Sequence, residues 1–177
     1  KTETAVSDDV MIQLHLPQYP VESLGAPKAV MIQYRFYKQD EQIDIELHWF
    51  EKDANRLPEA MWFSFALEVD NQNIWKLDKL GERISPLEVV KNGNRNLHSV
   101  DKGLYYAGAD GEVVIETKDS PLVSPGEKRL LQFNNTFASL EGGFHFNLYN
   151  NIWGTNFPMW YEEDGKSRFT LKLKSHF

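Results

Sequence analysis

The sequence contains no cysteine, which excludes disulfide bonds, thiolate metal sites and a cysteine nucleophile. This absence suits an oxidising compartment as well as a reducing one. No apolar run approaches the length that spans a membrane, so we expect no membrane partner. Positive charge is also scarce, because the formal net charge is −7 and no run of Lys and Arg exceeds two residues. A nucleic-acid-binding surface needs clustered cations, so we expect no nucleic-acid partner either.

Familiar catalytic motifs are missing too. There is no nucleophile elbow, no glycine-rich phosphate loop and no dinucleotide fingerprint. No two histidines have the close spacing of a zinc site; they are His15, His48, His98, His145 and His176. The acids Glu162, Glu163 and Asp164 are typical of a solvated turn, and no carboxylate pair stands out as a glycosidase pair. The sequence therefore predicts no catalytic residue, no metal ligand and no cofactor in this chain.

Alternating apolar and polar residues fill most of the chain. Several runs alternate or are strongly apolar: 10–16, 29–38, 42–51, 60–69, 74–80, 113–118 and 168–174. The short polar link at 39–41 predicts a hairpin, and the run at 60–69, the most apolar, predicts a buried central strand. Prolines and glycines predict loops at 17–27 and a turn at 124–127, and residues 130–133 lead toward the strand that follows. No segment keeps a helical period over three turns. We predict one all-β domain of 177 residues, a large antiparallel β-sandwich with little or no helix.

One stretch, residues 142–161, combines a strand with amides and indoles. Phe144 and Phe146 alternate with His145 and Asn147, so the pattern predicts a polar outward side that carries no charge. The candidate binding residues are His145, Asn147, Tyr149, Asn150, Asn151, Trp153, Asn156 and Trp160. Aromatic faces beside fixed amides suit a sugar, because its C–H face packs on indole and its hydroxyls bond to amides. The alternative is that these aromatics only fill the core at a sheet edge and that the two adjacent Asn form a turn.

Several segments resemble a known family. They are 48–52, 55–65, 96–100, 119–126 and, above all, 143–160, which includes Phe-Asn-Leu-Tyr-Asn-Asn-Ile-Trp-Gly-Thr-Asn-Phe. Together they are similar to the C-terminal β-sandwich of an uncharacterised family related to the α-mannosidases of glycoside hydrolase family 38. The resemblance extends from about residue 29 to residue 173. It implies a mutarotase-like supersandwich whose loops complete the sugar-binding cleft of a separate N-terminal catalytic domain.

The resemblance also implies what this chain lacks. In such enzymes the zinc and the carboxylate nucleophile belong to the N-terminal domain, so no residue here inherits those roles. Arg56, Glu59 and His98 match motif positions, and we expect buried, charge-paired roles for Arg56 and Glu59. Because the chain begins at Lys1 and not at Met, we expect it to be a piece of a longer protein, and the resemblance implies that this piece is the C-terminal part. We favour an extracellular or periplasmic location.

Three hypotheses follow. The first is a non-catalytic, carbohydrate-associated domain of a glycoside hydrolase, with the catalytic domain and carbohydrate as partners. The second is a free-standing carbohydrate-binding module. The third is a purely structural interdomain module, which an exposed apolar patch would favour.

Overall fold

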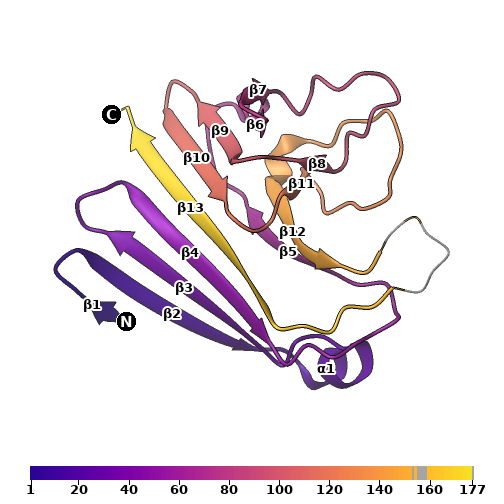
Figure 1. The fold of residues 1–177 in the computed structure, drawn as a ribbon. Helices are drawn as coiled ribbons and strands as arrows, with labels where there is room; N and C mark the ends of the chain where they lie inside the picture. Colours follow the sequence, from indigo (N-terminus) through magenta and orange to yellow (C-terminus); the bar gives the residue numbers. More distant parts are fainter. Residues whose placement is uncertain (153, 155–158, 177) are drawn as a thin grey trace.

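The computed structural model describes residues 1–152, 154 and 159–176 (Figure 1). Candidate residues Trp153 and Asn156 therefore lie outside the described residues. The strands are β1 (Thr2–Glu3), β2 (Ser7–His15), β3 (Ala29–Tyr37), β4 (Gln42–Phe50), β5 (Ala60–Phe65), β6 (Lys76–Lys79), β7 (Glu82–Ile84), β8 (His98–Ser99), β9 (Gly103–Ala107), β10 (Gly111–Thr117), β11 (Leu122–Pro125), β12 (Phe144–Asn150) and β13 (Gly165–Ser175). The helical segments are α1 (Gln18–Leu24) and two 3-10 turns, η1 (Gln72–Ile74) and η2 (Leu140–Gly142).

The strands form two antiparallel sheets, which confirms the predicted all-β sandwich. The large sheet has nine strands in the order β1-β2-β3-β4-β13-β10-β9-β6-β7, and the small sheet has four in the order β5-β12-β11-β8. The predicted hairpin is confirmed as β3 and β4, with Ala29 opposite Phe50 and Phe36 opposite Ile43. The small sheet covers one end of the large sheet, and β2 and β3 lie away from it (Figure 1).

Three local predictions were wrong in whole or in part. The loop predicted at 17–27 contains α1, because Pro20 lies in its first turn, where no backbone N–H is needed, and Gly25 closes it at φ 65°. The turn predicted at 124–127 is present at Gly126 and Glu127, where Gly126 has φ 74°, but Ser124 and Pro125 belong to β11, which pairs with both β8 and β12. The run at 60–69 forms the edge strand β5, not a central strand. Phe65 is buried in the core, whereas Met61 and Phe63 both pack against core residues and line a groove.

The remaining strand predictions hold in part. The segment predicted at 74–80 is shortened to β6, because η1 occupies residues 72–74. The run at 130–133, expected to lead toward β12, contains no strand. The other alternating runs correspond to β2, β10 and β13.

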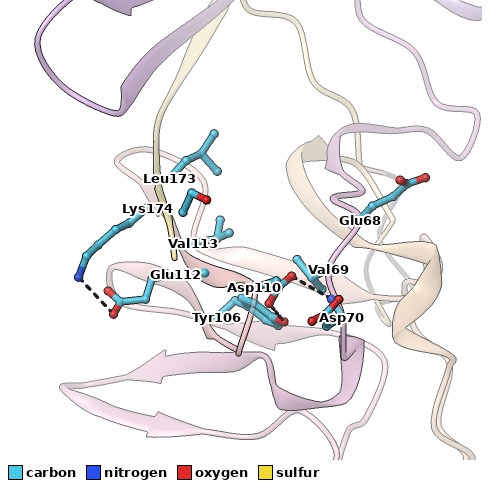
Figure 2. Close-up of a pocket in the computed structure, with 11 residues that line it drawn as sticks. Glu68, Val69, Asp70, Tyr106, Asp110, Glu112, Val113, Leu173 and Lys174 are labelled. Carbon is cyan, nitrogen blue, oxygen red and sulfur yellow. Dashed lines mark hydrogen bonds and ion pairs between the residues drawn. The ribbon is translucent and has the colours of Figure 1, made fainter. Parts of the chain in front are cut away.

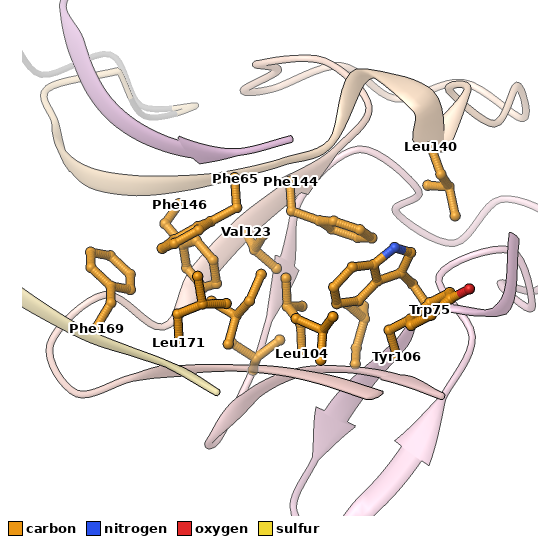
Figure 3. Packing of buried hydrophobic residues seen from close by; sticks show 14 of the residues in the cluster. Phe65, Trp75, Leu104, Tyr106, Val123, Leu140, Phe144, Phe146, Phe169 and Leu171 are labelled. Carbon is orange, nitrogen blue, oxygen red and sulfur yellow. The ribbon is translucent and has the colours of Figure 1, made fainter. Parts of the chain in front are cut away.

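The main core lies between the small sheet and the β13-β10-β9-β6 part of the large sheet (Figure 3). Phe146 is fully buried, and its ring lies 5.1 Å from that of Phe169 and 5.8 Å from that of Phe65. Trp75 closes one end of this core against Phe144, with the ring centroids 5.2 Å apart. Aromatic side chains bury large apolar areas, so this layer provides most of the hydrophobic stabilisation.

The β2–β3 end of the large sheet differs, because its inner face has no second layer among the described strands. Leu14 pairs with Val30 and Ile12 with Ile32, and the register places all four side chains on the face that continues into the core. Val30 is buried, yet 40% of Ile12 and 45% of Leu14 are exposed. The apolar face of the sheet therefore extends beyond the small sheet that covers the rest of it.

Candidate functional site

Strand β12 carries the first candidate residues and lies inside the small sheet, between β5 and β11. The predicted alternation is correct, since Phe144 and Phe146 face the core. The predicted outward side, however, is not open to solvent: His145 is only 8% exposed, and Asn147 is buried as well. The pattern identified the two faces of the strand but not the chain segments that cover the second face.

His145 contacts the strand beside it. Its Nδ1 lies 2.7 Å from the hydroxyl of Ser64, the residue directly opposite on β5. Burial lowers the pKa of His145, and the charge of Lys128 acts in the same direction, whereas the carbonyl of Gly126 opposes them. The imidazole is therefore neutral at pH 7 and bonds to an exposed serine, which makes a polar pair that can accept or donate a hydrogen bond.

Asn147 stabilises an irregularity in the pairing of β12 with β5. The register shifts between Asn147 and Tyr149. The Asn147 amide donates to the carbonyls of Met61 (3.3 Å) and Tyr149 (3.2 Å), and its oxygen accepts from the Asn150 amide at 2.6 Å. A bulge disrupts the ladder locally, so this side chain bonds to carbonyls that adjoin the irregularity. Its amide is occupied within the chain.

Asn151 fastens the 55–59 loop to the end of β12. Its oxygen accepts from the backbone N–H of Glu59 at 2.8 Å, and its amide donates to the carbonyls of Asn55 (3.0 Å) and Leu57 (2.8 Å). The backbone N–H of Asn151 also donates to the Glu59 carbonyl at 3.2 Å. Asn150 forms the predicted turn, since its oxygen accepts from the N–H of Ile152 at 3.1 Å.

Tyr149 lies in an aromatic cluster beside a buried ion pair. Its ring stacks on Tyr161 at 4.7 Å and lies 5.5 Å from Trp49. Lys52 is buried, and its Nζ lies 5.8 Å from the Tyr149 ring and 2.9 Å from Oε1 of Glu59, an ion pair without hydrogen-bond geometry. Burial raises the pKa of Tyr149, and the Glu59 carboxylate raises it further. The paired role predicted for Glu59 is therefore confirmed.

Trp160 is the candidate residue that is most open to solvent among those described. Its side chain is 52% exposed, and the Arg56 guanidinium lies 5.0 Å from the centre of its ring. The prediction that Arg56 is buried and charge-paired is wrong, because the residue is exposed and contacts an indole instead of a carboxylate. Arg56 lies in a surface loop, where water solvates its charge, so it does not need the carboxylate partner that a buried cation would need.

An apolar groove of about 600 Å³ lies beside Tyr149. It is lined by the inner face of β2–β4, by α1 and the loop after it, and by β5 with the loop before it. Among the lining residues that the structure describes, Glu59, already paired with Lys52, is the one that carries a charge. The size and apolar lining are typical of a surface that receives an apolar group. Sequence reasoning found the alternating run at 10–16, but alternation alone does not show that one face of a strand lines a groove, so this groove was missed.

A second hollow of about 520 Å³ lies between the ends of β10 and β13 and the segment after β5 (Figure 2). Its acids include Asp110, which accepts from the Tyr106 hydroxyl at 2.5 Å and from the Asp70 N–H at 2.9 Å. The Tyr106 hydrogen bond holds the pKa of Asp110 below its usual value. Within the described residues, no group of three or more His, Asp or Glu side chains could hold a metal ion.

Comparison with protein-family models and with curated proteins finds no match for this chain. In the part of the chain that the structure describes, no helix is long and apolar enough to cross a membrane. The family resemblance of the 143–160 segment and its neighbours therefore stays a prediction.

Proposed function

We propose that this chain is a non-catalytic, carbohydrate-associated β-sandwich domain of a glycoside hydrolase similar to the α-mannosidases, and that it packs on the catalytic domain of the same protein. One observation carries the proposal: β12, in the segment that resembles the family, reaches an apolar groove at Tyr149, which belongs to both. A surface of this kind offers a neighbouring domain apolar contact and offers sugars an aromatic edge.

The groove supports the packing half of the proposal. The sheet face that forms one wall of the groove is partly exposed at Ile12 and Leu14. Because the described residues that line the groove include no cation and one acid, which is already paired, the groove suits an apolar segment of a neighbouring domain better than a charged ligand. Covering this face would remove the exposed apolar area from water.

Trp160 supports the carbohydrate half. Its half-exposed indole can pack on the C–H face of a sugar ring, and the neighbouring Arg56 provides donors for hydroxyl groups. Asn147 and Asn151 use their amides within the chain, so the proposal gives them a positioning role. His145 has the same role, since it is buried against Ser64.

Tryptophan fluorescence of this chain, titrated with manno-oligosaccharides, tests the sugar contact. We expect quenching that Trp160→Phe abolishes and that the matched variant Trp62→Phe, at the groove wall, retains. A chain that includes the N-terminal region, assayed on aryl-mannosides, tests the parent activity, and Trp160→Ala should lower turnover. Absence of quenching by any glycan, together with unaltered turnover in Trp160→Ala, would contradict the carbohydrate role.

The second candidate is a purely structural interdomain module. It is favoured by the partly exposed apolar face and by the internal bonds of the Asn147 and Asn151 amides. In that case Trp160→Ala leaves turnover unchanged, whereas Leu14→Asp in the groove weakens association with the N-terminal domain. The free-standing binding module makes the opposite prediction: glycans bind, and Leu14→Asp has no effect on their binding.

A further inference from the structure

Strand β2 is a long free edge of the large sheet. The short strand β1 pairs only with Asp8 and Asp9, so no described strand pairs with the outer side of β2 from Val10 to His15. On its inner side, β2 pairs with β3 continuously from Ser7 to His15, without a bulge. A regular edge of this kind presents unpaired backbone N–H and C=O groups to another strand.

This edge lacks the features that usually prevent pairing between sheets. Residues 10–16 contain no Lys, Arg, Asp, Glu or Pro, although 25% of the whole chain is charged. The opposite edge of the same sheet, β7, has three residues and carries Glu82 and Arg83. In the small sheet β8 has only two residues, and β5 forms a wall of the groove. Among the described edges, β2 is therefore the one best suited to accept another strand.

The side chains of this segment are also suited to a second strand. On the inner face Ile12 and Leu14 are partly exposed and apolar. On the outer face Met11 is 57% exposed, and the neighbouring Gln13 is uncharged. A partner strand would therefore need the same pattern, with apolar residues on one face and uncharged residues on the other.

We propose that two copies of this chain pair through β2, antiparallel and about a two-fold axis at Gln13. This register places Ile12 of each copy beside Leu14 of the other, and Gln13 beside Gln13, so the segment is complementary to itself. No Lys, Arg, Asp or Glu lies in the seam, so the acidic residues behind the net charge of −7 on each chain produce no direct repulsion there. Asp8 and Asp9 of the two copies lie at opposite ends of the seam. The proposal does not rest on the proposed function, because it uses the backbone edge of β2, although Leu14 also lines the groove.

Because the chain has no cysteine, a single introduced thiol reports this pairing directly. We expect Gln13→Cys to form a disulfide-linked dimer under mild oxidation, since directly opposite residues bring their Cβ atoms within about 4.5–5.5 Å. Gln33→Cys is the matched control: Gln33 lies on the same face one strand inward, where β2 and β4 already flank it, and it should stay monomeric.

The mass of the unmodified chain across a dilution series, measured by light scattering after size exclusion, completes the test. We expect a dimer that dissociates on dilution and that Met11→Lys disrupts, because a cation on the edge opposes strand pairing. Circular dichroism checks that Met11→Lys keeps its fold; Gln13→Lys replaces it if it does not. A monomer at all concentrations, equal cross-linking of Gln13→Cys and Gln33→Cys, or a dimer that persists in the lysine variant would overturn the proposal.

Discussion

The two halves of the nine-stranded sheet carry the same alternating pattern and meet different surroundings. At the β10–β13 half, Ile115 and Phe169 are sealed beneath the small sheet. At the β2–β3 half, Ile12 and Leu14 occupy equivalent inward positions and remain partly exposed. Alternation therefore defines which face of a strand is apolar, whereas the layer that covers this face depends on the rest of the chain or on a partner.

Truncation of one apolar side chain in each half should separate the halves most strongly. We expect Phe169→Ala, in β13, to lower the free energy of unfolding by about 3–5 kcal/mol, because it leaves a cavity in the sealed core. Leu14→Ala, in the open half, should cost about 0.5 kcal/mol or less. Urea unfolding of the two variants measures both values, and similar losses would mean that the halves are equally covered.

Acid should weaken the small sheet, which covers the sealed half, through His98 in β8. Burial, assisted by the charge of Lys79, lowers the pKa of His98 from 6.5 to about 4. As the pH falls, the unfolded chain binds a proton first, so the stability contributed by neutral His98 is complete above pH 6.5 and is lost toward pH 4. The loss should reach about 3 kcal/mol near the lower limit.

The control for this pH effect is His98→Asn. It should show a shallower fall in the free energy of unfolding between pH 7 and pH 4.5, though not a flat one, since burial also lowers the pKa of His145. Identical slopes for the wild-type chain and His98→Asn would rule out a contribution from this imidazole.

Between the two halves lies the loop that Asn151 fastens to β12. Asn151→Ala removes the partners of the Glu59 N–H and of two carbonyls, so we expect the free energy of unfolding to fall by about 1–3 kcal/mol. Asn151→Asp keeps the acceptor and loses the donors, so its free energy of unfolding should lie between those of the wild-type chain and Asn151→Ala. Asn134→Ala, in an exposed loop, is the matched control and should be nearly neutral. Equal stability of all these variants would show that the Asn151 side chain does not hold the 55–59 loop to β12.

The smallest effect is expected at Trp160. Its contact with Arg56 is exposed, so Trp160→Ala should cost no more than about 0.5–1 kcal/mol in chemical denaturation. A larger loss would show that the indole stabilises the fold, and it would weaken the proposal that Trp160 is available to a ligand.

Much of the fold could be predicted from local pattern. The β3–β4 hairpin follows from two alternating runs with a short polar link, and the alternation of β12 identified its core face. Helix α1 was missed because its prolines and glycine indicate a loop, although Pro20 is compatible with a first helical turn and Gly25 with a helix end.

The candidate site was less predictable because its contacts join distant parts of the chain. Asn151 bonds to residues more than ninety positions earlier, and no local pattern reveals which loop lies opposite. For the same reason the burial of His145 and Asn147 could not be foreseen, since it depends on segments that cover the second face of β12. Neither the hydrophobic period of the sequence nor the spacing of its residues predicts that the indole of Trp160 is exposed.

Amide hydrogen exchange on a dilute sample tests directly whether the β2–β3 half is open and the β10–β13 half sealed, because it compares both halves within one molecule. We expect the amides of Val10–His15 in β2 to exchange much faster than those of β10, which lies between β9 and β13. Equal protection of β2 and β10 in the dilute monomer would show that the β2–β3 face is already covered, and it would contradict the account.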